Sequence, residues 1–176
     1  MSQDIVKNFE RVSADLVQKA SVHQAAIFAD VAGRRGVMHG RISALRPHMK
    51  VAGPALTVEV RPGDNLMIYK ALMDMQPGQV LVVDGGGDGN NALVGELIML
   101  YAMQRGCTGF VIDGAIRDVA AFQDSDFPCY AKTSIHRGPY KNGPGEINVP
   151  VSVCGQVSQP GDWIVGDEDG VVSFPH

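Results

Sequence analysis

The sequence has few cysteines, few aromatic residues and no excess of basic charge. Its three cysteines, Cys107, Cys129 and Cys154, form no C-x-x-C pair. This usage argues against a disulfide framework and predicts a reduced, cytoplasmic protein whose thiols are buried as small apolar groups. Lys and Arg together number 15 against 19 Asp and Glu, a net charge of −4. Nucleic acid is therefore not an expected partner, because such proteins present a basic face.

Long apolar runs and nucleotide-binding motifs are also missing. No window reaches the roughly 18 uninterrupted apolar residues of a membrane span. The first residues carry charges and no apolar segment, so we expect neither a signal peptide nor a membrane partner. The glycine-rich stretch GGGDGNN, residues 85–91, matches neither G-x-x-x-x-G-K-[ST] nor G-x-G-x-x-G. It is predicted to be a flexible loop and not a nucleotide site.

The 176 residues, 45% hydrophobic and 19% charged, suffice for one folded domain over residues 1–176. Residues 34–50 are predicted to be a loop, and Asp64 the N-cap of a helix. Apolar spacing predicts helices at 5–19, 22–33, 65–75, 95–105 and just after 118. It predicts strands at 54–60, 80–84, 109–113 and 129–135, and a β-rich end with turns at 160–162 and 166–170. The order indicates an α/β domain with parallel strands, a mixed sheet or paired sheets, and helices packed on them.

The stretch ALVGELIMLYAMQRGCTGFVIDGAIRDVAAF, residues 92–122, carries the strongest functional signal. An almost wholly apolar helix, predicted to lie in the core, begins at Gly95 and Glu96. The strand that follows leads to Arg117 and Asp118. In open α/β sheets, ligands bind beyond the carboxyl ends of the strands. We therefore expect the helix start and the two charged residues to share one edge of the sheet.

These residue types suit the binding of an anion and a cation together. The first turn of a helix has free N–H groups, and Arg117 would add a planar two-pronged donor for the same carboxylate or phosphate. Asp118 beside a bound anion suggests a divalent cation such as Mg²⁺ between them. Glu96 could hold a water and transfer a proton. The plainer alternative is that Arg117 and Asp118 form only a surface ion pair of little energetic value.

Other polar residues have simpler explanations. Asp84 and Asp113 end buried strands, and each is predicted to position a glycine loop by accepting backbone N–H bonds. His136 and Arg137 lie in a predicted loop with Pro139 and Lys141. This loop is expected to be solvated, and the alternative is that it lines a pocket entrance or selects a distal carboxylate. The remaining histidines share no metal-ligand spacing and are expected to be structural or exposed.

Five blocks in order, LVVDGGG (81–87), GEL (95–97), GFVIDGAIRD (109–118), GPGEINVPVSVCG (143–155) and PGDWIVGDEDGVV (160–172), resemble the RraA-like proteins. That family includes metal-dependent aldolases for 4-hydroxy-4-methyl-2-oxoglutarate, which also decarboxylate oxaloacetate. The resemblance implies a lyase that cleaves 4-hydroxy-2-keto acids to pyruvate and a second keto acid with Mg²⁺ or Mn²⁺. It also implies the swivelling β/β/α fold, assembled as a homotrimer or a dimer of trimers.

The aldolases of the family carry an acidic residue, twenty intervening residues and then Arg-Asp. Glu96, Arg117 and Asp118 fit this spacing, with glutamate where aspartate is expected. By resemblance, Asp118 would bind the metal, Glu96 would hold a metal-bound water, and the substrate carboxylate would be bound by Arg117 and the backbone of Gly95, Glu96, Leu97 and Ile98. No lysine lies in this motif, since Lys70, Lys132 and Lys141 are outside it, so a Schiff-base route is disfavoured.

Another branch of the family inhibits ribonuclease E and is expected to lack the aspartate after the arginine. The presence of Asp118 favours the enzyme, and a non-catalytic regulator of ribonuclease E-type activity, acting by protein–protein binding, is the alternative. Family members usually continue into a C-terminal helical segment, which in some aldolases supplies an acid to a neighbouring site. This sequence ends at His176, so either it is a truncated piece or that contribution is absent.

Overall fold

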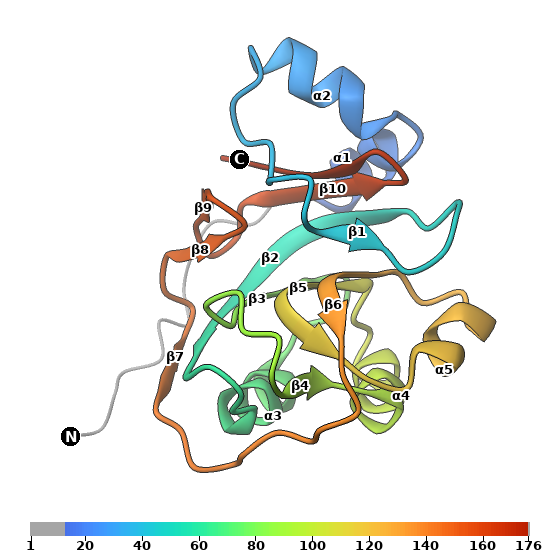
Figure 1. Ribbon diagram of the computed structural model, residues 1–176. Helices are drawn as coiled ribbons and strands as arrows, with labels where there is room; N and C mark the ends of the chain where they lie inside the picture. Colours follow the sequence, from blue (N-terminus) through green and yellow to red (C-terminus); the bar gives the residue numbers. More distant parts are fainter. Residues whose placement is uncertain (1–12, 176) are drawn as a thin grey trace.

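A computed structural model describes residues 13–175 as a curled mixed sheet with helices on both sides (Figure 1). The helices are α1 (Ala14–Ser21), α2 (Ala25–Val31), α3 (Leu66–Asp74), α4 (Glu96–Gln104) and α5 (Val119–Asp124). The strands are β1 (Ser43–Ala44), β2 (Val51–Val60), β3 (Val80–Asp84), β4 (Ala92–Val94), β5 (Gly109–Ile116), β6 (Cys129–Ser134), β7 (Gly145–Ile147), β8 (Val151–Val153), β9 (Gln156–Ser158), β10 (Trp163–Asp167) and β11 (Gly170–Phe174).

The main sheet has the strand order β1-β6-β5-β3-β2-β10-β11, with β4 paired to β5 and β7 paired to β2. Strands β2, β3, β5 and β6 are parallel, whereas β1, β7, β10 and β11 join antiparallel. The two ends of the order, β1 and β11, approach each other, so the sheet nearly closes on itself. The predicted mixed α/β fold with packed helices is confirmed.

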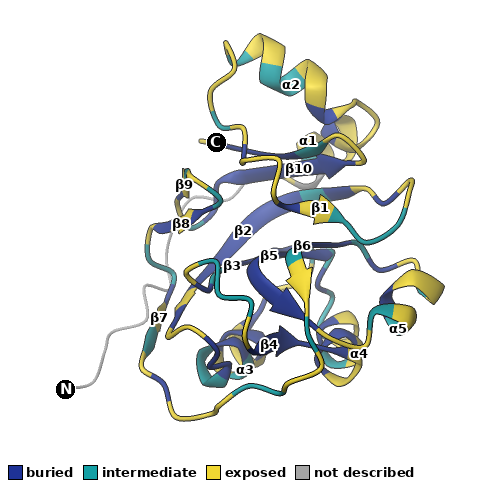
Figure 2. Ribbon diagram, in the orientation of Figure 1, coloured by how far each residue is buried: buried dark blue, intermediate teal, exposed yellow. Residues whose placement is uncertain are grey.

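The central strands are valine-rich because both of their faces are buried. Leu81 and Val83 of β3 face one apolar cluster, which lies against α3 and α4, and the alternate residues Val80 and Val82 face a second cluster inside the curled sheet. Side chains of a strand alternate between faces, so a strand covered on both sides loses its polar face. Figure 2 shows these strands buried along their length.

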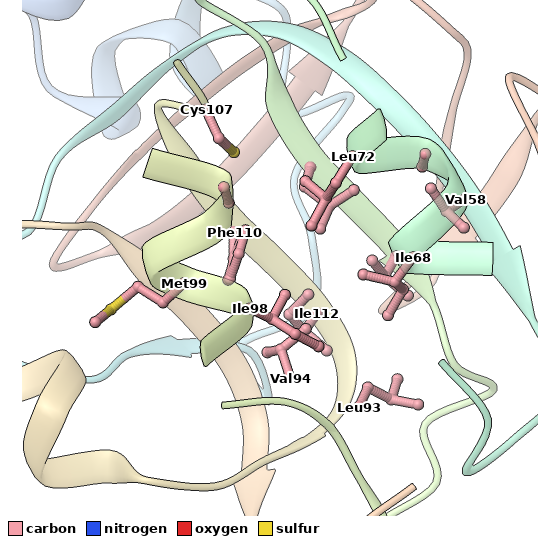
Figure 3. Close-up of a cluster of buried hydrophobic side chains, with 14 of the residues drawn as sticks. Val58, Ile68, Leu72, Leu93, Val94, Ile98, Met99, Cys107, Phe110 and Ile112 are labelled. Atoms are coloured by element: carbon pink, nitrogen blue, oxygen red, sulfur yellow. The ribbon is translucent and has the colours of Figure 1, made fainter. Parts of the chain in front are cut away.

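Helices α3 and α4 pack against the parallel strands through a shared apolar face. Figure 3 shows Ile68 and Leu72 of α3 and Ile98 of α4 in one cluster with strand residues such as Phe110 and Ile112. Burying one such side chain is worth about 1.5–3 kcal/mol. This packing fixes α4 against β5, and with it the position of the first turn of α4.

The opposite side of the molecule is covered by α1 and α2. Phe28 of α2 stacks on Phe174, and Phe174 stacks on Trp163, with ring centroids 5.6 and 5.9 Å apart. The buried carboxylate of Asp167 accepts the backbone N–H of Ala25 at 2.8 Å, which satisfies a free donor in the first turn of α2. The turns predicted at 160–162 and 166–170 bracket β10 as expected.

Several predicted elements differ from the structure. The helix predicted at 5–19 is seen as α1, which begins at Ala14 after the cap Ser13, and residues 5–12 lie outside the described part of the chain. The 34–50 loop contains the short strand β1, β5 continues three residues beyond 113, and β4 was not predicted. Strands of two or three residues carry no periodicity of their own, so only their tertiary partners define them.

Two local predictions were wrong. Asn65, not Asp64, is the N-cap of α3, although Asp64 Oδ1 still accepts the N–H of Leu66 at 3.0 Å. Helix α4 is not wholly core, because Leu97 is 75% exposed and Leu100 and Met103 are also exposed. When nearly every residue of a helix is apolar, the sequence does not indicate which face of the helix stays exposed.

Candidate functional site

The candidate site lies where β5 ends beside the start of α4. All eight residues of β5 are buried, and the first exposed residues after it are Arg117 and Asp118. The N–H of Arg117 donates to the carbonyl of Val94 at 3.0 Å, which ties the end of β5 to the residue before Gly95. The structure thus brings together the two charged residues and the helix start, as the sequence predicted.

Asp118 has a backbone conformation that aims its carboxylate at α4. Its φ of 56° and ψ of 43° are left-handed, a conformation that aspartate tolerates better than most residues. Asp118 is the N-cap of α5, yet its side chain makes no hydrogen bond to that helix. Instead, Oδ2 accepts the N–H of Glu96 at 3.0 Å, in the first turn of α4. A carboxylate there is stabilised by the partial positive charge of the helix end.

Arg117 lies beside the same carboxylate oxygen. Its Nε is 3.7 Å from Asp118 Oδ2, and each of the two side chains is 43% exposed. A surface ion pair of this kind contributes little by itself. Asp118, however, is also bonded to the helix end, so the pair is part of a three-way arrangement and the surface-pair alternative does not describe it fully.

Position 95 needs a glycine because Arg117 and Asp118 lie very close to its backbone. A Cβ atom at position 95 would lie 2.5 Å from Asp118 Oδ2 and 3.0 Å from Arg117 Cγ. Gly138 stands near the other end of the arginine, where a Cβ would lie 3.2 Å from a terminal guanidinium nitrogen. Two glycines therefore leave room for Arg117 and Asp118 in their observed positions.

A cavity of about 100 Å³ opens at this point. Its walls include Gly95, Leu97, Ile98, Arg117 and Asp118 from the predicted site. The Glu96 side chain is exposed and does not line the cavity, so only its backbone N–H takes part in the observed arrangement. The sequence prediction thus located the pocket but not the direction of this one side chain.

Outside residues 92–122, the cavity is also lined by Asn65, Tyr69, Pro139 and Lys141, none of which was a predicted site residue. Lys141 Nζ lies 4.8 Å from the centre of the Tyr69 ring, a cation–π contact that holds an exposed cation at the cavity. These residues come from α3 and from the 135–144 loop, distant in sequence from α4. No local motif marks them, and only the pairing of β2 with β3 and β7 brings them together.

Asn65 is 2% exposed and has an unusual hydrogen-bonding state. Its Nδ2 donates to the carbonyl of Leu93 at 2.9 Å, which fixes the orientation of the amide. Oδ1 has no hydrogen-bond partner among the described residues. Because buried polar atoms are nearly always paired, an unpaired acceptor in the wall of a cavity invites a donor from a ligand or a water.

Asp64 holds the 135–144 loop against the cavity. Its buried carboxylate accepts the N–H groups of Leu66, Asn142 and Gly143 at 3.0, 2.6 and 3.0 Å. Burial by itself raises the pKa of this carboxyl, but the three backbone donors and the nearby Arg61 outweigh burial and hold the pKa below its usual value. Asp64 is thus a charged anchor for the loop that carries Lys141.

The glycine loop at 85–91 is anchored differently from the prediction. Asp84 Oδ1 accepts the N–H of Gly86 at 2.9 Å, as expected. The Asp113 side chain instead accepts the N–H of Cys154 at 2.8 Å, and only its backbone carbonyl accepts N–H groups of the glycine loop. Asp113 therefore positions the turn between β8 and β9, not the loop.

The loop with His136 and Arg137 is tied to β4 by its backbone. The carbonyl of Arg137 accepts the N–H of Ala92 at 2.8 Å, and the carbonyl of Gly138 accepts Asn91 Nδ2 at 2.6 Å. Both His136 and Arg137 have exposed side chains that do not line the cavity. The solvated alternative describes these two side chains.

The cysteines are neutral thiols. Burial raises the pKa of Cys107 to about 11, and it raises the pKa of Cys129 further. Cys154 is only half-buried, against the prediction, yet burial and the neighbouring Asp113 raise its pKa to about 12. A thiol that stays protonated is a poor nucleophile and metal ligand.

Two further findings bear on the type of site. Across residues 13–175, no cluster of three or more His, Cys, Asp or Glu side chains is arranged to hold a metal. Mg²⁺ does not need one, because it often takes one or two carboxylates and keeps several waters. In the same part of the chain, no helix is long and apolar enough to span a membrane.

Comparison with known proteins shows which family the chain is related to. A sequence profile of the RraA-like family, described as Aldolase/RraA, matches residues 13–173. A Halalkalibacterium halodurans protein, named as a proposed 4-hydroxy-4-methyl-2-oxoglutarate aldolase, is 43% identical over 76% of this chain, which spans only 64% of that protein. The 4-hydroxy-4-methyl-2-oxoglutarate aldolase of Thermus thermophilus is 35% identical over 72% of this chain and 76% of its own length.

The fold agrees with these matches. The crystal structure of Streptomyces coelicolor RraAS2, described as an unusual member of the RNase ES inhibitor RraA protein family, superposes with a TM-score of 0.84. It is 30% identical and covers 96% of this chain and 88% of its own. The profile match over nearly the whole described chain, the identities and the shared fold lead to one conclusion: this chain belongs to the RraA-like family.

Proposed function

We propose that the protein is a divalent-metal-dependent lyase that cleaves 4-hydroxy-2-keto acids to pyruvate and a second keto acid. Oxaloacetate would lose CO₂ through the same pyruvate enolate. The observation that carries the proposal is the joint position of the Arg117 guanidinium and the Asp118 carboxylate at the N-terminus of α4, beside one cavity. The aldolase names of the related proteins support it.

The substrate carboxylate would bind at the start of α4. The N–H groups of Leu97 and Ile98 lie in the first turn and have no acceptor within the helix. The N–H of Glu96 already donates to Asp118. Fewer backbone N–H groups are therefore available to the substrate than the resemblance implied for the four residues 95–98. Arg117 adds a fixed positive charge, which orients the keto acid and stabilises the charge that develops on its keto oxygen.

The residues present fit a divalent cation. Oδ2 of Asp118 is used by the helix end, and Oδ1 makes no hydrogen bond to a described residue. A half-exposed carboxylate with one oxygen free suits a hard cation that keeps most of its waters. When bound there, Mg²⁺ or Mn²⁺ would supply Lewis-acid stabilisation of the enolate charge. Arg117 and the helix amides hold the substrate so that this charge forms next to Asp118.

The distal part of the substrate would meet Lys141 and Asn65. Lys141 offers a cation at the cavity, which suits the second carboxylate of a diacid. The unpaired Oδ1 of Asn65 is an acceptor for a substrate hydroxyl or for a water next to it. Lys141 lies in the loop that the sequence offered as a pocket entrance, and charge recognition by this lysine requires no Schiff base.

Glu96 is proposed as the group that moves the hydroxyl proton through a water. Its side chain is exposed and outside the cavity wall, one residue from the Asp118 hydrogen bond. A glutamate here needs a rotamer change to reach the site. A Glu96→Gln enzyme should retain substrate binding, measured as an unchanged KM for oxaloacetate decarboxylation, and lose aldol cleavage, which alone requires removal of the hydroxyl proton.

Self-association as a homotrimer or a dimer of trimers belongs to this proposal. Leu100 and Met103 of α4 and Met73 of α3 are exposed large apolar side chains, as is Leu97, which also lines the cavity. Apolar surface of this kind favours contact with another protein surface. A second copy meeting this face would also shield the cavity from water.

The direct test is metal removal. EDTA should abolish pyruvate release from 4-hydroxy-4-methyl-2-oxoglutarate, and Mg²⁺ or Mn²⁺ should restore it. Trapping of a substrate adduct on lysine by borohydride would contradict the scheme. The alternative, a regulator of ribonuclease E-type activity, is favoured by the structural match to RraAS2. In that case purified protein would show no metal-dependent turnover, and ribonuclease inhibition would survive Asp118→Asn.

A further inference from the structure

A second hollow, of about 370 Å³, lies apart from the candidate site. It is bounded by the glycine loop, by Lys132 of β6 and by the turn between β8 and β9, and it shares no lining residue with the cavity at α4. The proposed lyase chemistry makes no use of it. Its polar groups therefore need a separate explanation.

Two cations, Lys132 and Arg41, line this hollow together with one carboxylate, Asp113, with which neither is within ion-pair distance. Lys132 Nζ donates to the carbonyl of Gly87 at 2.6 Å, which leaves two of its three N–H donors available. Arg41 enters from the 34–42 segment. Within residues 13–175 neither side chain forms an ion pair. Such a concentration of positive charge is notable in a chain with a net charge of −4.

Both cations act electrostatically on the thiol of Cys154. Burial is the main cause of the raised pKa of this thiol, and Asp113 raises it further, whereas Lys132 and Arg41 both lower it. Two side chains from distant segments therefore act on one point in the hollow. Because the thiol itself is neutral, it does not repel an anion.

One oxygen of the acid and the backbone amides of the glycine loop at the hollow are already used. Asp113 Oδ2 accepts the N–H of Cys154, and the N–H groups of Gly86 and Gly87 donate to Asp84 and to the Asp113 carbonyl. Gly87 has a φ of +67°, and a Cβ there would collide with Lys132 Nζ. The loop is thus shaped around the lysine, and the available donors are those of the cationic side chains.

We propose that this hollow binds a phosphate group, either free or carried on a small organic molecule. A guanidinium offers a planar fork and an ammonium a point charge, which together suit a tetrahedral dianion. His39 lies at the same hollow and would add a third donor when protonated. The volume exceeds that of bare phosphate, so there is room for a small organic group beside the glycines.

The test uses metal-free protein, so that phosphate cannot be captured by a cation at Asp118. Amide resonances of Gly86, Gly87 and Gly155 are followed by NMR during titration with inorganic phosphate and with glycerol 3-phosphate, at constant ionic strength adjusted with chloride. Saturable shifts are expected in the wild-type protein. Lys132→Met and Arg41→Met should each weaken binding at least about tenfold, since each removes a charge-assisted contact.

Two controls separate this hollow from other positive groups. Lys50→Met removes an exposed lysine elsewhere, and Arg117→Met removes the cation of the candidate site; neither should change the titration. Arg41 makes no hydrogen bond to a described residue, so Arg41→Met keeps the fold even if Lys132→Met does not. Tighter binding of glycerol 3-phosphate than of phosphate would identify a carried phosphate, and the reverse order would identify free phosphate.

Three results would overturn the proposal. The first is the absence of saturable shifts with either compound. The second is an equal loss of binding in all variants, which indicates non-specific attraction. The third is binding lost in Arg117→Met and retained in Arg41→Met, which would place the phosphate at the candidate site. None of these results depends on lyase activity, so they leave the proposed function unaffected.

Discussion

Aspartates in the described part of the chain have two different roles: Asp84 and Asp64 hold backbone segments in place, whereas Asp118 keeps one oxygen available beside the cavity. Asp84 uses one oxygen for Gly86 and the other for Ser152, and Asp64 accepts three backbone N–H groups. Asp118 accepts a single N–H and is 43% exposed. Residues of one chemical type therefore divide into anchors of loops and one candidate for chemistry.

This difference follows from the number of backbone N–H groups near each carboxylate that need an acceptor. The backbone N–H groups of residues 86, 142 and 152 donate to the side chains of Asp84 and Asp64, and backbone donors left unpaired are costly. At the start of α4, water or a ligand can satisfy the remaining donors, so one hydrogen bond from Asp118 is enough. The number of backbone donors around a carboxylate thus indicates whether it serves folding or function.

Replacing Asp118 with Asn tests the functional side of this comparison and should give the largest effect. The loss of the proposed metal ligand would remove several kcal/mol of charge stabilisation, so turnover should fall roughly a thousandfold. Stability should change by only about 0.3–1 kcal/mol, because the Asn oxygen still accepts the Glu96 N–H and only the charge at the helix end is lost. Steady-state rates and urea unfolding measure the two effects.

Asp126→Asn is the matched control for Asp118→Asn. This exposed aspartate pairs with Arg46 on the surface and does not line the cavity. Its replacement should leave turnover unchanged. Equal turnover losses in the two variants would remove the special status given to Asp118.

Gly95→Ala tests whether close approach keeps Arg117 and Asp118 in place. The new Cβ would stand 2.5 Å from Asp118 Oδ2, so the carboxylate must move. A displacement of about 1 Å at a site of this kind can cost a hundredfold in rate. Gly40→Ala is the control, because a Cβ at position 40 meets nothing within 4 Å. A Gly95→Ala enzyme as active as the Gly40→Ala enzyme would contradict the packing argument.

Asp64→Asn tests the anchoring side of the comparison. The amide cannot accept all three backbone donors and brings an N–H₂ group against them, so unfolding free energy should fall by about 3 kcal/mol. Urea unfolding measures this change. Asp15→Asn, which breaks only an exposed pair with Lys19, should cost under about 0.5 kcal/mol. A small loss in Asp64→Asn would show that the loop has other sufficient anchors.

The same anchor should make stability depend on pH in the acid range. Burial raises the pKa of Asp64, but its backbone donors and Arg61 bring the folded-state pKa below the usual 3.8. The charged form is therefore favoured by folding. Its contribution is complete above pH 3.8 and is lost as pH falls below that value toward the folded pKa. The stability difference between wild type and Asp64→Asn should shrink over this window and stay constant at neutral pH.

The sequence located the half of the site that lies on one continuous segment. Gly95, Arg117 and Asp118 stand on either side of a helix and a strand whose apolar patterns are strong, so their meeting follows from the parallel β-α-β unit. Likewise, β3 was predicted with its correct bounds, because a valine-rich run buried on both faces has no other common structure.

The other half of the site depends on contacts between distant segments. Asn65 and Lys141 reach the cavity through α3 and the 135–144 loop, and nothing in their local sequences marks them. The Asp113 side chain binds Cys154 and not the glycine loop, and this too depends on how the turn between β8 and β9 folds back. Side-chain direction at Glu96 and exposure of Leu97 are decided by packing, which periodicity in a uniformly apolar helix does not encode.

Lys141→Met is expected to give the smallest effect. It tests a cation at the cavity, whereas the earlier variants test carboxylates and a glycine. Lys141 is exposed and held by Tyr69, so its attraction for a substrate carboxylate is screened by water. Removing it should raise KM for a 4-hydroxy-2-keto diacid roughly two- to fivefold, the range of an exposed ion pair, with kcat little changed. A 4-hydroxy-2-keto monoacid, which lacks the distal carboxylate, should show no change in KM. An equal KM increase for both substrates would mean that Lys141 supports the cavity wall and does not recognise charge, whereas a loss of kcat would bring it into the chemistry beside Arg117.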